Sequence, residues 1–82
     1  MNVLLRNALG EVLREQRKDN KGTLRYVSKM AACSYGHLSD VEKGRKEVSS
    51  ELLNSVLRVQ GIKLSDLLRQ VADKVSEMEQ QQ

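Results

Sequence analysis

The chain has 82 residues, which suffice for one small domain and exclude a second. Its only aromatic residues are Tyr26 and Tyr35, and it has no Phe, Trp or Pro, so a core must be built from Leu, Val, Ala, Ile and Met. The five glycines favour short turns between helices over a sheet. The composition therefore predicts an all-α fold.

The charge is unevenly distributed along the chain. Residues 1–46 contain ten Lys and Arg against five Asp and Glu, whereas residues 47–82 contain four against six. This asymmetry favours an electropositive face for a polyanion and a separate, nearly neutral surface for another partner. On charge alone, ordinary solvated surface residues explain the pattern equally well.

Several functional classes are excluded by what the sequence lacks. One cysteine, Cys33, and one histidine, His37, cannot build a zinc site or a credible Cys/His dyad, and no phosphate-binding loop occurs. We therefore expect no enzyme, no cofactor, no metal and no small-molecule ligand. The apolar start at 1–5 is too short for a signal peptide or a membrane span, so we expect a cytoplasmic protein without membrane contact. Cys33 is expected to be a small core residue rather than a redox switch.

The first half of the chain predicts two helices. Apolar residues recur at spacings of three and four over 3–17, which is typical of an amphipathic helix. A polar stretch follows, in which Gly22 suits a left-handed turn. Thr23 is a good N-cap for a second helix over 24–30, and an apolar turn at 31–33 should end it.

Three more helices are expected downstream. Ser34 can cap a third helix that runs to Lys43 and is stopped by Gly44. Ser49 or Ser50 can cap a fourth, closed by Gly61, and a fifth should begin at 63 or 64.

Residues 24–43 form a supersecondary unit of two short helices joined by a three-residue turn. A unit of this kind is typical of helix-turn-helix proteins, whose second helix enters the major groove of DNA. The stretches TLRYVS at 23–28, SYGHLSDVEKG at 34–44 and SSELL at 49–53 resemble the lambda-repressor and Cro type of helix-turn-helix domain. The match covers residues 5–69. Ser28 and Ala32 stand where that family prefers Ala and Gly, and both remain small.

A narrower resemblance is carried by three further stretches, LRNALGEVLR at 5–14, KEVSSELL at 46–53 and LSDLLRQV at 64–71. They resemble the actinobacterial Clp gene regulators, the ClgR family. This resemblance implies an activator of genes for Clp proteases and related stress functions, with RNA polymerase as a further partner.

The wider family implies which residues contact DNA. Carried over position by position, the base-contacting residues are Tyr35, Gly36, Ser39 and Asp40, and Ser34 and His37 lie near phosphates. Several family members have Gln at the positions of Tyr35, Gly36 and Asp40, so the target sequence does not follow from the resemblance. Asp40 either accepts a hydrogen bond from cytosine or pairs with Lys43.

Five basic residues flank the unit and are candidates for phosphate contacts that fix register without reading sequence. These residues are Arg25, Lys29, Lys43, Arg45 and Lys46. The family also implies a partly buried ion pair between Arg17 and Glu42, which ties the first helix to the recognition helix.

The last helix carries an apolar seam at spacings of four, three, four and three. Its members are Leu64, Leu68, Val71, Val75 and Met78. Because the family core needs only the first two turns of this helix, the later residues should form an unsupported extension that packs on a second copy, joined by residues 3–5. A frayed tail is the alternative.

These expectations divide the chain into a DNA-binding domain at 1–69, a dimerisation helix at 64–79 and a polar tail at 80–82. A dimer should bind a pseudo-palindromic operator on double-stranded DNA, with recognition helices about 34 to 36 Å apart. Two other functions remain open, a repressor or antitoxin of the same fold and a helical module that contacts only proteins. Steep weakening by salt would favour DNA binding over the protein module.

Overall fold

The computed structural model describes residues 2–81, and within that range the chain forms five α-helices and no strand. The predicted five-helix, all-α fold is confirmed, and each helix starts where the sequence places it. The first helix continues past Arg17. The helices are α1 (Val3–Asp19), α2 (Leu24–Met30), α3 (Tyr35–Glu42), α4 (Ser50–Gln60) and α5 (Leu64–Gln80).

Side-chain caps start four of the five helices. The Thr23 hydroxyl accepts a hydrogen bond from the backbone N–H of Tyr26, and Asn2 caps α1 in the same way. Ser49 rather than Ser50 caps α4. Each cap satisfies a backbone donor that the first turn of a helix leaves unpaired, which explains why these helices start at these residues.

The helix ends use left-handed backbone at four places. Gly44 and Gly61 have φ of 74° and 67°, as expected of glycines that stop a helix. The expectation for Gly22 is wrong, because the left-handed residue after α1 is Lys21, with φ of 58°. Gly22 instead ends the turn after α1 by donating its N–H to the carbonyl of Arg17 at 2.9 Å. Ala32, in the turn between α2 and α3, also has positive φ, at 56°.

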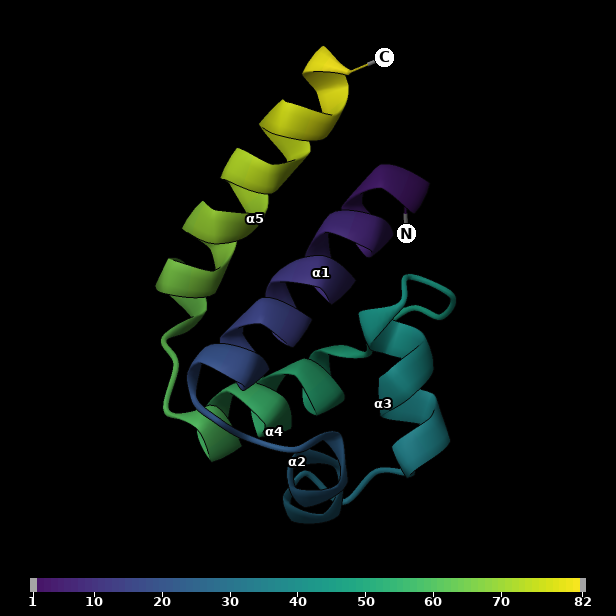
Figure 1. Ribbon diagram of the computed structural model, residues 1–82, viewed down its shortest axis with the longest axis vertical. Helices are drawn as coiled ribbons and strands as arrows, with labels where there is room; N and C mark the ends of the chain where they lie inside the picture. The colour runs from purple at the N-terminus through teal and green to yellow at the C-terminus, as the bar shows by residue number, and fades with distance from the viewer. Residues whose placement is uncertain (1, 82) are drawn as a thin grey trace.

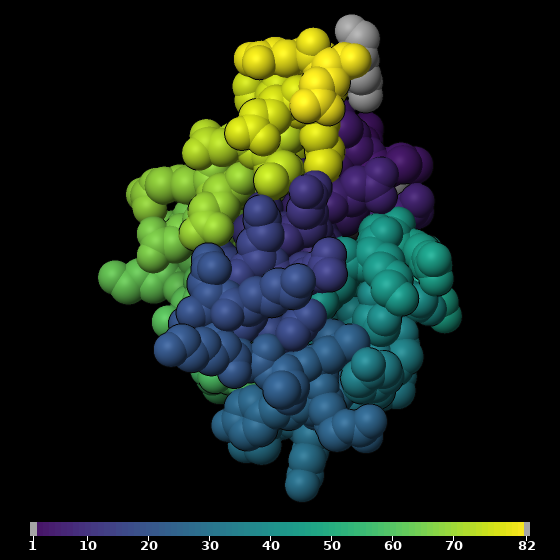
Figure 2. Space-filling view, viewed as in Figure 1, coloured from purple at the N-terminus to yellow at the C-terminus, as the bar shows by residue number. Residues whose placement is uncertain are grey.

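Helix α1 runs through the middle of the molecule (Figure 1). It packs against α5 on one side and α3 on the other, while α2 packs against α3 and α4. The space-filling view shows α1 exposed between these two neighbours (Figure 2). The largest of the fully buried side chains are contributed by all five helices: Leu13, Leu38, Leu67, Val12, Val27, Val41 and Val56.

The expectation of an unsupported extension is wrong. Helix α5 runs antiparallel to α1 along its length (Figure 1), and only 4% of Val71 is exposed. Val75 and Met78 are half-buried against the same core. An apolar stripe at helical spacing looks alike whether its partner is α1 or a second copy, which explains the error. The expected tail also begins inside α5, at Gln80, and Gln82 lies outside the described residues.

Candidate nucleic-acid interface

Helix α3 presents two different faces. Its buried face consists of Leu38, Val41 and Glu42, which pack into the core. Its N-terminus is fixed by Ser34, whose hydroxyl accepts the His37 N–H at 3.0 Å. The four expected base-contacting residues lie away from that buried face: Tyr35 and Gly36 are exposed, and Ser39 and Asp40 are half-buried.

The ion pair expected between α1 and α3 is present. Arg17 donates from Nε to Glu42 Oε2 at 2.8 Å and from Nη2 to Oε1 at 2.9 Å. The two side chains are 12% and 6% exposed, so water competes little for the pair. The hydrogen bond to Glu42 raises the pKa of Arg17, which therefore remains charged. The pair fixes the C-terminal end of α3 to α1.

Two contacts that hold α3 in place were not foreseen from the sequence. A Cβ on Gly10 would meet the carbonyl oxygens of Val41 and Glu42, so α1 and α3 approach each other as closely as a glycine allows. Arg6 donates from Nε to the Gly44 carbonyl at 2.8 Å, across 38 positions of sequence. A glycine inside a helix and an arginine on its flank are the only sequence signals of these contacts, and neither is specific.

The loop after α3 carries three exposed cations, Lys43, Arg45 and Lys46. The backbone N–H groups of Arg45 and Lys46 both point at the Asp40 carbonyl, at 2.8 and 3.4 Å. The left-handed Gly44 and its bond to Arg6 hold the loop against α1. This anchored backbone places three positive charges beside the exposed face of α3.

A second basic group comes from α2. The Arg25 guanidinium lies over the Tyr35 ring, 5.4 Å from its centroid, and Lys29 is exposed one turn further along α2. A pocket beside Tyr35 is also lined by Arg14, Ser39 and Lys43. Arg14 therefore joins the expected cations on this side of the molecule, although no sequence signal marked it out.

The two explanations for Asp40 can now be compared. Among residues 2–81, Asp40 forms no ion pair with Lys43, although their spacing would allow one. The Asp40 carboxylate therefore remains free to accept a hydrogen bond from outside the chain. His37 lies half-buried next to the turn that contains Cys33. Cys33 packs against the core, and burial raises the pKa of its thiol.

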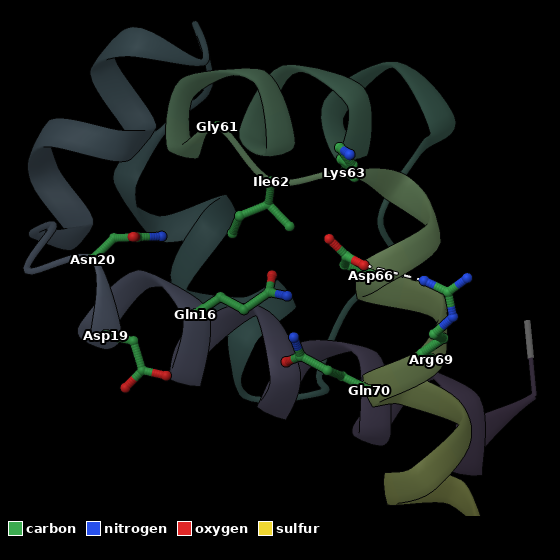
Figure 3. A pocket seen from close by; sticks show the side chains of 9 residues that line it. All are labelled: Gln16, Asp19, Asn20, Gly61, Ile62, Lys63, Asp66, Arg69 and Gln70. Atoms are coloured by element: carbon green, nitrogen blue, oxygen red, sulfur yellow. Dashed lines mark hydrogen bonds and ion pairs between the residues drawn. The ribbon is translucent and has the colours of Figure 1, made fainter.

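A hollow lies away from α2 and α3, where the ends of α1 and α4 meet the start of α5 (Figure 3). Ile62 and Gln16 line it, and the exposed Asp66–Arg69 ion pair lies at its rim. Gln16 is only 5% exposed, and neither atom of its amide has a hydrogen-bond partner within the described range.

Residues 2–81 contain neither a cluster of metal-binding side chains nor a membrane-crossing helix. No three His, Cys, Asp or Glu side chains gather as metal ligands would. No helix in that range combines the length and the apolar character that crossing a membrane requires.

Taken together, the α2–turn–α3 unit, its outward-facing recognition helix and the cations on both flanks define a helix-turn-helix DNA-binding regulator rather than an enzyme. The transcriptional regulator ClgR of Mycobacterium tuberculosis is 40% identical over 79 residues, which are 96% of this chain and 70% of the relative. This identity holds for both the CDC 1551 and the H37Rv strain. The chain belongs to the ClgR family of transcriptional regulators.

Solved structures agree with this assignment. The crystal structure of the clp gene regulator ClgR from Corynebacterium glutamicum has a TM-score of 0.90 at 44% identity, over 94% of this chain and 82% of the other. A second crystal structure of that regulator has a TM-score of 0.82 at 46% identity, over 87% and 91%. No protein-family model matches the chain. The narrower of the two resemblances noted in the sequence is confirmed.

Proposed function

We propose that the protein binds a pseudo-palindromic operator on double-stranded DNA as a dimer and activates genes for Clp proteases and related stress functions. The relatives are named as ClgR and as clp gene regulators, which supports the gene class. An activator bound at a promoter also contacts RNA polymerase. Such a regulator acts in the cytoplasm, where the chromosome lies. The proposed domains are the DNA-binding part at 1–69, with the unit at 24–43, and a dimerisation surface on α5.

The observation that carries this proposal is the outward face of α3 with cations on either side. We assign base reading to Tyr35, Gly36, Ser39 and Asp40 because they lie away from the buried face of the helix. Phosphate contacts are assigned to Arg25 and Lys29 on one side, to Lys43, Arg45 and Lys46 on the other, and to Ser34 and His37 at the helix start. Gly36 has no heavy atom within 4 Å of where a Cβ would lie, so DNA backbone or a base can approach it closely.

Footprinting on genomic duplex DNA at two salt concentrations tests the proposal. Lys46→Ala should weaken binding to all sequences and lower the slope of log affinity against log salt by about 0.9 for each phosphate contact removed. Tyr35→Ala should instead change which sequences are preferred. Lys63→Ala is the matched control, because this exposed lysine lies at the start of α5, beside the hollow of Figure 3 and away from α2 and α3. Absence of any footprint would overturn the proposal.

We propose a dimer surface that is smaller than the seam expected from the sequence. Val71 is buried within the subunit, so we leave it out of the proposed surface. Leu64 and Leu68 are among the most exposed large apolar residues of the chain. Half-buried Val75 shares their side of α5, since positions 64, 68 and 75 follow helical spacing. We propose that these residues, with the exposed edge of Met78, contact the second copy. Exposed Val3 and Leu5 lie at the N-terminal end of the antiparallel α1.

Sedimentation of a Leu64→Asp/Leu68→Asp variant tests this surface. We expect a folded monomer whose affinity for a full operator falls to that for a half-site. Val71→Asp is unsuitable, because a charge there would disrupt the monomer core. A Leu64→Asp/Leu68→Asp variant that still sediments as a dimer would place the interface elsewhere.

A further inference from the structure

Arg25 and Tyr35 contact each other between α2 and α3. Arg25 belongs to α2 and Tyr35 is the first residue of α3, and the guanidinium carbon lies 5.4 Å from the ring centroid. The tyrosine is 51% exposed, and within residues 2–81 its hydroxyl forms no hydrogen bond. Arg25 likewise forms no ion pair within that range. Among residues 2–81, this contact is the one cation–π interaction, and it joins the ends of both side chains.

We propose that Arg25 is the positioning residue for base reading by Tyr35, an inference that rests on the proposed function. A guanidinium is planar, so its face can lie on an aromatic ring while the N–H groups at its edge remain free. The edge can then bind a DNA phosphate while the face holds the ring. Arg25 thereby fixes the position of the Tyr35 ring relative to the DNA backbone, and so determines which base edge the ring meets.

This role differs from that of an ordinary phosphate contact. A cation that only neutralises a phosphate supplies affinity for every sequence, and a lysine can replace it. A stacked guanidinium cannot be replaced by a lysine, because a lysine ammonium is compact, strongly hydrated and lacks the planar face. Arg25→Lys therefore keeps the charge and removes the stacking.

Binding measurements on a selected operator and its single-base variants test the inference. The base pair read by Tyr35 is the one whose preference changes in Tyr35→Ala. Arg25→Lys should lower the preference for that pair by about two- to fivefold, with the salt dependence unchanged. In the Tyr35→Ala background, Arg25→Lys should have no further effect on preference. Lys29→Ala, one turn along the same helix, is the control and should weaken binding to all DNA sequences by the same factor.

Two results would overturn the inference: an unchanged base preference in Arg25→Lys, or a loss that adds in full to that of Tyr35→Ala. An NMR spectrum of the free protein separates this failure from failure of the proposed function. Ring current should shift the Arg25 side-chain protons in the wild type and in Tyr35→Phe, and this shift should vanish in Tyr35→Ala. If the protein binds duplex DNA but the Arg25 side-chain shifts are the same in the wild type and in Tyr35→Ala, only the inference is overturned. A wild type that binds no duplex would overturn the proposed function and the inference with it.

Discussion

Arg17 and Glu42 form a two-pronged ion pair between α1 and α3, with both N–O distances below 3 Å and both side chains nearly buried. Removing one partner leaves the other charge buried without a counterion, which is far more costly than losing a surface pair. We expect Arg17→Met to lower the free energy of unfolding by about 3 kcal/mol in urea titrations.

The matched control is the exposed pair of Arg69 and Asp66, whose N–O distance is 3.2 Å. Arg69→Met should change stability by less than about 1 kcal/mol. Because the pKa of Arg17 is raised in the folded state, its contribution is complete throughout the neutral range and is lost only as strongly alkaline pH passes that raised pKa. Equal effects of the two Arg→Met substitutions would contradict this account.

Gly10 and Gly36 are both helical glycines, and they should respond to alanine with opposite signs. Alanine gains about 1 kcal/mol of helix propensity over glycine at an open site. At Gly36 a Cβ meets nothing within 4 Å, so Gly36→Ala should raise the melting temperature. At Gly10 it would meet backbone oxygens of α3 that cannot move independently, so Gly10→Ala should cost about 1 to 3 kcal/mol. A stabilised Gly10→Ala protein would show that α1 and α3 separate easily.

The buried amide of Gln16 destabilises the fold, and a substitution can remove this effect. Both polar atoms of its buried amide have no partner within the described range, and a buried unpaired polar group costs about 1 to 3 kcal/mol. Gln16→Met keeps the side-chain length and removes the polar atoms, so we expect stability to rise by about 1 kcal/mol. Gln70→Met, at an exposed position of the same hollow, is the control and should have little effect. A destabilised Gln16→Met variant would mean that the amide is hydrogen-bonded in solution.

Ala32 occupies a backbone conformation that suits glycine better. Its φ of 56° places it in the left-handed region, which costs a residue with a Cβ about 1 to 2 kcal/mol. Part of this cost is offset by the greater freedom of glycine in the unfolded chain, so Ala32→Gly should stabilise by about 0.5 to 1 kcal/mol. Lys21→Gly, with φ of 58°, should change thermal stability in the same direction. Loss of stability in both variants would contradict the strain argument.

The helix boundaries could be predicted because the signals for them are local. Thr23, Ser34 and Ser49 each cap the helix that follows, and Gly44 and Gly61 each adopt the left-handed turn that ends one. A cap or a stop needs only its own residue and the next few, so a single sequence contains the whole signal.

The partners of each helix were harder to predict because they depend on distant residues. Of the seam predicted on α5, Val71, Val75 and Met78 pack against the core, whereas Leu64 and Leu68 are exposed and Leu67, which the seam did not include, is fully buried. The bond from Arg6 to Gly44 and the close approach at Gly10 depend on how α1 meets α3 in space. In the candidate site, the resemblance supplied the outward positions of α3, whereas the placement of Arg14 and the stack of Arg25 on Tyr35 required coordinates.

The two faces of α3 have separate tasks, and this separation bears on how such a regulator can change. Leu38, Val41 and Glu42 face inward and fix the helix, while Tyr35 and Gly36 face outward. Substitutions on the outer face alter few interactions that hold the fold together, so that face can be rewritten at little risk to the scaffold. The core thus fixes the recognition helix, and a few substitutions on the exposed face of that helix can produce regulators with other DNA targets.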